Sequence, residues 1–324
     1  MSLVLGLDGG GTKTVLAVAD HLGNVVGLLH GPGLSPSQGA DWEGALTRLM
    51  AQVPAARDTG VAVLGLPFHG EVAAYSARQR AVALALMADR ATVLNDVQVA
   101  FTGAFAGGPG ALILAGTGSM ARASADGVTQ VRVGGWGDLI GDEGSAYWIG
   151  ARAIGCLSKC LDGRHEDQEF AVQILAALGV TRKRLITWAY GPGDRRAAVA
   201  GLARVVTGLA NSGNVTASEI VENAAQHLAQ HLTTAWRLIG QSGVPKWSFA
   251  GGVFNDLGIR ARVAELVGAA PLLPRLPPVG GALLEAARRA GWVVDDGWVD
   301  RLATGLVDQA ETRGNGRQAP SASG

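Results

Sequence analysis

A stretch near the start of the chain combines groups that could bind phosphate and a metal ion. The sequence "GLDGGGTKT" (residues 6–14) places the carboxylate of Asp8 before three consecutive glycines, and Thr12 and Lys13 follow them. Successive backbone N–H groups in such a glycine-rich turn can point outward together and bind phosphate. A simple turn is the alternative, because glycine tolerates positive φ. Three glycines exceed the need of a tight turn, so we expect a phosphate-binding turn.

Two common phosphate-binding motifs do not fit this stretch. A Walker-type loop has glycine where Thr12 stands, and a dinucleotide fingerprint has its last glycine where Thr14 stands. Both motifs open a helix, whereas the following "TVLAVADHLGN" alternates in polarity and ends in a Gly-Asn turn, which predicts a second strand. The glycines are therefore expected at a hairpin tip. The stretch "GALILAGTGSMARASADG" (110–127) predicts a second hairpin of the same kind.

A second carboxylate, that of Asp96, lies in "TVLNDVQVAF", where an apolar strand is expected to end and a helix to begin. Ligands of open α/β sheets bind outside the carboxyl ends of the strands. A carboxylate there could accept the proton of a substrate hydroxyl. The structural alternative is that Asp96 caps the helix, because Asn and Asp are preferred caps.

The stretch "GGWGDLIGDEGSAYWIG" (134–150) holds the densest group of candidate ligand-binding residues. The carboxylates of Asp142 and Glu143 could accept hydrogen bonds from sugar hydroxyls, and the indole of Trp136 could cover an apolar sugar face. They could instead stabilise the next helix and fill a core. Two acids also suit glycoside hydrolysis, but that chemistry does not explain two phosphate-type hairpins.

Two further pairs are expected to be structural. His227 and His231 share a helix face, but the residues between them lack the glutamate of a zinc-protease motif. Cys156 and Cys160 have the same spacing, and two thiolates alone do not complete a metal or cluster site.

The elements that must position these residues alternate between strands and helices, which predicts an α/β fold. We expect an N-terminal domain over residues 1–106 and a larger domain over residues 107–291, whose last helix could pack back on the first domain. Residues 292–324 form an extension expected to be disordered from about residue 311, where the sequence is polar and rich in Gly, Ser and Pro.

The composition limits the classes of partner. The 324 residues include 27 basic and 27 acidic residues, a balance that gives no electrostatic footprint for nucleic acid or an anionic membrane. No apolar run is long enough to span a bilayer, and the start lacks the pattern of a signal peptide. We expect a cytoplasmic protein with a small-molecule partner, and a homodimer is left open.

Together, "GLDGGGTKT", "LND", "LAGTGS", "GGWGDLIGDEGSAYWIG" and "FAGGVFND" resemble the N-acetylglucosamine kinase and BadF/BadG/BcrA/BcrD-type ATPase branch of the sugar kinase, Hsp70 and actin superfamily. The resemblance runs in order from Leu3 to about Gly291. It implies two ribonuclease-H-like domains of the actin-like ATPase fold, with ATP and substrate in a cleft between them. It also implies ATP-dependent phosphorylation of an amino sugar, with N-acetylglucosamine and its 6-phosphate favoured over glucosamine or another hexose.

The resemblance also implies roles for individual residues. Asp96 matches the catalytic base and a sugar ligand, and Asp8 matches a residue that holds hydrated Mg²⁺. The remaining matches form two groups: ATP-binding Gly10, Gly11, Thr12, Lys13, Thr117, Gly118, Ala210, Gly251 and Gly252, and sugar-binding Ser37, Ser119, Trp136 and Asp142.

The sequence departs from the family pattern in two ways. Ser37, in "GLSPSQG", and Met120 replace asparagines that are usual in the sugar kinases, which puts the N-acetyl preference in doubt. The other class within the branch comprises ATPases that activate CoA-ester reductases or dehydratases through an iron–sulfur cluster. They carry a cysteine just before the GTG turn, where this chain has Leu114 and Ala115, so the cluster lacks its ligands.

Overall fold

Residues from both ends of the chain build the same unit of the structure. In the computed structural model, which describes residues 2–36, 41–53, 58–191 and 195–315, unit 1 comprises Met1–Gly108 with Pro274–Gly324, and unit 2 comprises Pro109–Leu273. The sequence suggests a domain over residues 107–291 whose last helix could pack back on the first domain. The chain after Leu273 clusters with unit 1.

Unit 1 contains a five-stranded mixed sheet in the order β3-β2-β1-β4-β5. Its strands are β1 (Leu3–Gly9), β2 (Lys13–Asp20), β3 (Val25–Pro32), β4 (Thr59–Leu66) and β5 (Ala91–Asn95). The strands β1, β2 and β3 form antiparallel hairpins, and β4 and β5 run parallel to β1. The carboxyl ends of β1, β4 and β5 therefore meet at one edge of the sheet.

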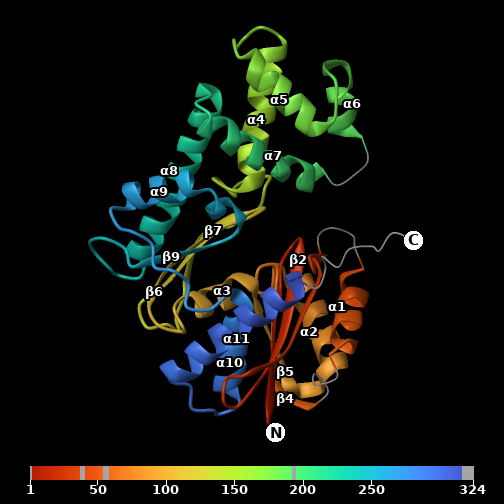
Figure 1. The fold of residues 1–324 in the computed structure, drawn as a ribbon, viewed down its shortest axis with the longest axis vertical. Coiled ribbons are helices and arrows are strands. Elements are labelled where there is room, and N and C mark those ends of the chain that lie inside the picture. Colours follow the sequence, from red (N-terminus) through yellow and green to blue (C-terminus); the bar gives the residue numbers. More distant parts are fainter. Residues whose placement is uncertain (1, 37–40, 54–57, 192–194, 316–324) are drawn as a thin grey trace. The chain divides into compact units, whose positions relative to one another are not determined.

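Helices cover both faces of this sheet (Figure 1). One face packs against α1 (Trp42–Ala51) and α2 (Ala73–Met87), and the short 3₁₀ helix η3 (Ala88–Arg90) follows α2. The other face packs against α3 (Asp96–Ala104), α10 (Pro278–Arg289) and α11 (Asp296–Asn315). Two apolar cores result, one on each side of the sheet.

Close glycine contacts explain why α10 belongs to unit 1. A Cβ on Gly6 of β1 would lie 2.7 Å from the Leu283 nitrogen, and a Cβ on Gly281 would overlap the carbonyl oxygen of Val99 in α3. Leu283 and Leu284 are fully buried against the sheet. The backbone of α10 therefore touches its neighbours directly.

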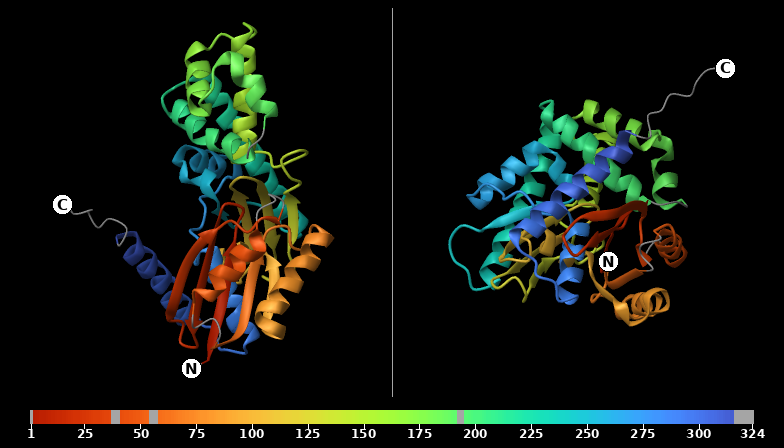
Figure 2. Two further views of the ribbon diagram at one scale, coloured as in Figure 1. Left: turned by 90° about the vertical axis from the view of Figure 1, so that its right-hand side faces the viewer. Right: turned by 60° about the horizontal axis from the view of Figure 1, so that its bottom comes forward.

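The last helix, α11, packs along strand β3 (Figure 2). Arg301 Nε donates to the Leu22 carbonyl at 2.7 Å, and Gln309 Nε2 donates to the Val25 carbonyl at 2.7 Å. The helix is described as far as Asn315, and the expected disorder from about residue 311 stays a prediction. Residues 316–324 lie outside the described chain.

Unit 2 repeats the strand pattern of unit 1. Its sheet has the order β8-β7-β6-β9, with strands β6 (Gly110–Ala115), β7 (Ser119–Ser124), β8 (Val131–Gly134) and β9 (Trp247–Ala250). The strands β6, β7 and β8 are antiparallel, and β9 runs parallel to β6, as β4 does to β1. A parallel bridge between Ser248 and Leu272 stands where unit 1 has β5.

Helices make up most of the rest of unit 2. They are α4 (Ala146–Leu161), α5 (Gln168–Leu178), η4 (Arg182–Arg184), α6 (Leu185–Tyr190), α7 (Arg195–Asn211), α8 (Val215–Leu238), η5 (Gly252–Asn255) and α9 (Leu257–Val267). The apolar periodicity of residues 145–161, 196–210 and 217–239 predicts helices, and the structure has them as α4, α7 and α8. Within the described ranges, no helix combines the length and apolar character needed to cross a bilayer.

Candidate functional site

The first glycine-rich turn is the tip of the β1–β2 hairpin, as the alternating pattern predicts. Gly9 pairs with Thr14 in the antiparallel register, and Gly10 N donates to the Lys13 carbonyl at 2.9 Å. A Cβ on Gly11 would meet no atom within 4 Å, and the backbone there has no positive φ. Neither packing nor backbone conformation requires glycine at this position. The open space therefore fits a group from outside the chain, such as phosphate.

Gly33 and Leu34, which follow β3, pack against this hairpin tip. A Cβ on Gly33 would overlap the Gly11 carbonyl oxygen and lie 2.9 Å from the Thr12 nitrogen. Leu34 is fully buried, and its N–H donates to the Gly10 carbonyl at 3.0 Å. No local sequence pattern marks Gly33, because its contact with the hairpin spans about 20 residues of chain.

Asp8 lies at the end of β1, directly before this tip. Burial, with the negative charge of Asp96 as the second cause, raises the pKa of Asp8 to about 7, although Lys13 opposes the shift. Two carboxylates that destabilise each other's charge suit a cation, and Mg²⁺ is usually held by one or two carboxylates, waters and phosphates. In the described residues, no group of three or more His, Cys, Asp or Glu is placed to hold a metal alone. Asp8 thus fits a hydrated Mg²⁺ better than a protein-only cage.

Asp96 is the first residue of α3, and the cap of that helix is its neighbour. Asn95 Oδ1 accepts the Val97 N–H at 3.0 Å, in the extended conformation of an N-cap. Asp96 Oδ1 accepts the same N–H at 2.9 Å. The N-cap of α3 is therefore Asn95, and capping is not the main role of Asp96.

The second hairpin, β6–β7, rests on the first turn of α4. Ala146 N donates to the Gly116 carbonyl at 2.8 Å, and Tyr147 N donates to the Thr117 carbonyl at 3.3 Å. The α4 cap is Ser145, whose Oγ accepts the Trp148 N–H. The tip carbonyls are thus held by the helix. Like Gly11, Gly116 has space around it, because a Cβ there would meet no atom within 4 Å.

Asp142 joins this hairpin to the loop before α4. Its carboxylate accepts the backbone N–H groups of Ser119 and Gly137, and Arg196 Nη2 of α7 lies 3.5 Å from Oδ2. Burial raises the pKa of Asp142, and these partners oppose the shift. A Cβ on Gly118 would lie 2.6 Å from Asp142 Oδ2, so glycine admits the carboxylate. The sequence analysis missed Arg196.

Ser119 and Trp136, two further residues expected to bind the sugar, differ in their surroundings. Ser119 is buried, and its Oγ donates to the Glu143 carbonyl at 2.7 Å. The Trp136 indole is 65% exposed, with the Arg132 guanidinium 5.0 Å from its ring centre, so a ring face is available to a ligand. Met120, which replaces an asparagine of the family pattern, packs against Gly135, where a Cβ would lie 2.6 Å from its Cε. Ser37 lies outside the described residues.

His231 of α8 lies behind the same loop. Its Nε2 is 3.6 Å from Glu143 Oε2, and a Cβ on Gly134 would lie 3.2 Å from its Cε1. Burial lowers the pKa of His231, which favours the neutral imidazole at neutral pH. The expectation that His231 has no metal-ligand role stays a prediction.

The loop between β9 and α9 packs on the second hairpin. Gly251 has φ of +96°, and a Cβ there would overlap the Ala115 carbonyl, so only glycine fits. At Gly252 a Cβ would meet no atom within 4 Å. Asp256, the cap of α9, accepts a hydrogen bond from Asn211 Nδ2 at 3.0 Å, which ties the loop to the end of α7. Ala210 precedes Asn211. The structure therefore brings Ala210 to the same end of unit 2 as the Gly251–Gly252 loop, and these are the residues expected to contact adenosine.

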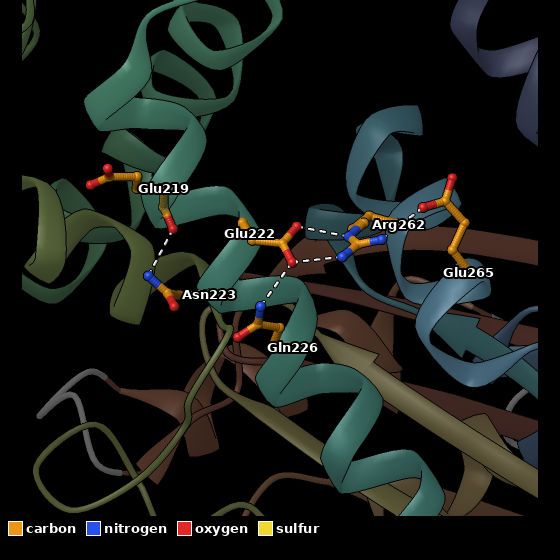
Figure 3. Close-up of polar contacts among 6 residues, drawn as sticks. All are labelled: Glu219, Glu222, Asn223, Gln226, Arg262 and Glu265. Atoms are coloured by element: carbon orange, nitrogen blue, oxygen red, sulfur yellow. Dashed lines mark hydrogen bonds and ion pairs between the residues drawn. The ribbon is translucent and has the colours of Figure 1, made fainter.

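An arginine holds α9 on α8 (Figure 3). Arg262 Nε and Nη2 donate to the two carboxylate oxygens of Glu222 at 2.8 and 2.9 Å, and Nη1 donates to Glu265 at 2.9 Å. Gln226 Nε2 adds a hydrogen bond to Glu222 at 2.8 Å. This bidentate pair links α8 to α9, the helix that follows the Gly251–Gly252 loop.

Comparisons with known proteins place these features in a family. Residues 5–286 match the BadF/BadG/BcrA/BcrD ATPase family. The chain is 32% identical over 167 residues to the N-acetylmuramic acid/N-acetylglucosamine kinase of Clostridium acetobutylicum. That alignment covers 51% of the chain and 55% of the relative, so the chain spans about half the length of the curated relative it matches.

Solved structures show the same fold. One is a Chromobacterium violaceum protein proposed to be an N-acetylglucosamine kinase, with a TM-score of 0.73 and 25% identity over 88% of this chain and 98% of that one. A similarly described Porphyromonas gingivalis protein has a TM-score of 0.71 and 20% identity over 90% of this chain and 100% of that one. The expected two-domain, actin-like ATPase fold is confirmed. With the family model covering most of both units, the chain belongs to the BadF/BadG/BcrA/BcrD ATPase family.

Proposed function

We propose that the protein is an ATP-dependent sugar kinase that phosphorylates an amino sugar, N-acetylglucosamine in the first place, at its 6-hydroxyl. The observation that carries the proposal is the open space at Gly11, Gly116 and Gly252, three glycines that neither packing nor backbone conformation requires. Each lies in a turn that the family resemblance assigns to the nucleotide. The names of the relatives support the choice of sugar.

Unit 1 supplies the groups that act on the sugar hydroxyl. The Asp96 carboxylate accepts the proton of the hydroxyl as its oxygen attacks the γ-phosphorus, with Asn95 holding the helix start in place. Lys13 and the N–H groups of the first hairpin bind phosphate oxygens. Asp8 would hold a hydrated Mg²⁺, which would neutralise charge on those oxygens.

Unit 2 supplies the second phosphate turn and the sugar-facing loop. The N–H groups of the Thr117–Gly118 turn bind phosphate, while the Gly251–Gly252 loop and Ala210 contact the adenosine. Trp136 covers the apolar face of the sugar, and Asp142 orients the loop through Ser119 and Gly137. Positioning and charge stabilisation are expected to carry most of the catalysis.

A panel of sugars tests this function. The purified protein is mixed with MgATP and N-acetylglucosamine, N-acetylmuramic acid, glucosamine or glucose, and ADP release is measured beside the formation of sugar phosphate. We expect N-acetylglucosamine to have the highest kcat/KM and phosphorus–proton coupling in the NMR spectrum to place the phosphate on C6. ATP hydrolysis without any phosphorylated sugar would contradict the proposal.

A further inference from the structure

The turn between β4 and α2 is built on a buried polar side chain. Gln79 of α2 is fully buried, and its Nε2 donates to the Pro67 carbonyl at 2.8 Å. Its Oε1 lies 2.9 Å from Nδ1 of His69, and this nitrogen must donate because an amide oxygen only accepts. Because both the oxygen and the nitrogen of this buried amide form hydrogen bonds, the amide holds the turn in one conformation.

The turn itself has an unusual backbone. Phe68 has φ of +62°, which costs free energy in a residue other than glycine and persists only where surrounding contacts hold it. Its carbonyl accepts the N–H groups of Glu71 and Val72 at 3.1 and 3.2 Å, and the Gly70 N–H donates to Ser76 Oγ at 2.9 Å. The consequence is a fixed backbone position for Glu71, the residue before the N-cap of α2.

That position is beside the residue that precedes Asp96. Asn95 Nδ2 donates to Glu71 Oε1 at 3.3 Å and to the His69 carbonyl at 3.1 Å. An amide nitrogen has two N–H groups, so Asn95 can donate to both acceptors at once. The carboxylate of Glu71 thus lies at the sheet edge where β4 and β5 end, and parallel α/β sheets bind ligands outside this edge.

The order of the strands separates Glu71 from the phosphate turn. In the order β3-β2-β1-β4-β5, the β1–β2 hairpin lies on one side of β1, and the turn that carries Glu71 lies on the other, next to β5 and Asp96. A carboxylate repels phosphate, whereas it accepts hydrogen bonds from hydroxyl groups. Its hydrogen bond with Asn95, the residue before the proposed proton acceptor Asp96, favours the sugar over the nucleotide.

We infer that Glu71 is a sugar-binding residue, whose carboxylate accepts hydrogen bonds from ring hydroxyls and so holds the sugar for proton transfer to Asp96. This inference rests on the proposed kinase function and extends its binding site to the turn of residues 67–72. Glu71 contributes binding and orientation, and Asp96 accepts the proton.

The test is the variant Glu71→Gln, which keeps the size of the side chain and removes its charge. Glu285→Gln is the matched control, because Glu285 lies on α10 of the same unit and pairs with Arg289 one helical turn away. Steady-state kinetics with varied sugar and varied ATP, calorimetric binding of N-acetylglucosamine and thermal melting are measured for both variants.

We expect kcat/KM for the sugar to fall on the order of 10- to 100-fold in Glu71→Gln, as for the loss of a charged hydrogen-bond partner, with KM for ATP unchanged. The calorimetric affinity for the sugar should fall with it, while Glu285→Gln behaves as the wild type. A purely structural role would instead lower the melting temperature and raise both KM values.

Two outcomes overturn the inference in distinguishable ways. If the wild-type protein phosphorylates sugar and Glu71→Gln does so with the same sugar KM and affinity, Glu71 is not a sugar ligand and the kinase function stands. If the wild-type protein neither binds nor phosphorylates any of the sugars, the kinase function fails and the role of Glu71 fails with it.

Gln79→Met provides a second variant that acts on Glu71 only through the turn. Methionine has a similar volume and removes both amide hydrogen bonds. If the turn serves to place Glu71, Gln79→Met should raise the sugar KM in the wild-type background and change it little in the Glu71→Gln background. Fully additive effects in the double variant would contradict this coupling.

Discussion

Asn95 and Asp96 share one hydrogen-bond donor, the Val97 N–H, which Asn95 Oδ1 binds at 3.0 Å and Asp96 Oδ1 at 2.9 Å. Asn95 has the backbone conformation of the N-cap, and its Nδ2 also reaches the His69 carbonyl. Support of the helix start and acceptance of a proton can therefore be assigned to neighbouring residues and tested separately.

Asp96→Asn should reduce kcat for sugar phosphorylation by on the order of 10²- to 10⁴-fold, the usual contribution of a general base. Its melting temperature should stay close to that of the wild type, because Asn95 keeps its cap. Asn95→Ala is the contrasting variant and should lose about 1 kcal/mol of stability from the cap alone. A normal kcat in well-folded Asp96→Asn would move the search for the base to Asp142 or Glu143.

Gly11→Ala should fold normally and bind nucleotide poorly, because its Cβ meets no atom of the chain but would enter the space assigned to phosphate. We expect the affinity for MgATP to fall by about tenfold or more, which is about 1.4 kcal/mol. Gly33→Ala should weaken nucleotide binding and also lower stability by about 1–3 kcal/mol, since its Cβ overlaps the Gly11 carbonyl. Calorimetry and melting separate the two, and wild-type affinity in Gly11→Ala would count against the phosphate site.

Asp8→Asn should raise the Mg²⁺ concentration needed for half-maximal activity by roughly 10- to 100-fold, the range seen for outer-sphere metal partners. The neutral amide keeps the side-chain shape and loses the charge that would hold hydrated Mg²⁺. Activity is measured against Mg²⁺ at saturating ATP and sugar. An unchanged Mg²⁺ dependence would place the metal elsewhere.

His231 should make the free energy of unfolding decrease at acidic pH. Burial lowers its pKa in the folded protein, with Glu143 opposing and His227 adding to the shift, so the unfolded chain takes up a proton near the ordinary pKa of 6.5 while the folded chain does not. The free energy of unfolding should therefore decrease as pH falls below about 6.5 and be independent of His231 above it. Urea unfolding at several pH values should give a flatter profile for His231→Gln. Parallel profiles for the two proteins would refute this role.

The protein should contain no iron–sulfur cluster. Leu114 and Ala115 stand just before the second hairpin, Ala115 is fully buried, and the two cysteines of the chain, Cys156 and Cys160, both lie on α4. Anaerobically purified protein should be colourless and show no stoichiometric iron by elemental analysis. If a four-iron cluster were found, the kinase proposal would be replaced, and Cys156→Ser with Cys160→Ser would show whether these thiols hold it.

The sequence predicted the parts of the site that local chemistry determines. Each glycine-rich tip follows an apolar strand and precedes an alternating one, so both hairpins and their positions could be inferred from short stretches. The strand before Asp96 and the long helices α4, α7 and α8 were found in the same way, because apolar periodicity reports local structure.

The remaining features depend on contacts between distant residues, which no local pattern records. The hydrogen bond between Asn95 and Glu71 joins residues 24 apart, and the pair of Arg196 with Asp142 joins residues 54 apart. Gly33 looks like an ordinary loop glycine until its contact with Gly11 is known. The helix α11 was missed because its sequence is polar, and its few apolar residues are buried against a strand that lies far earlier in the chain.

The return of α10 to unit 1 determines the order in which the two units can be completed during synthesis. Unit 2 is one continuous segment, whereas one face of the unit 1 sheet has α3 but lacks α10 and α11 until Leu283 and its neighbours have left the ribosome. The N-terminal part of unit 1 therefore stays incomplete, with apolar surface exposed, until the whole of unit 2 has been synthesised. A premature stop codon before residue 278 would leave the phosphate turn translated in full on a sheet that lacks α10 and α11 over one face.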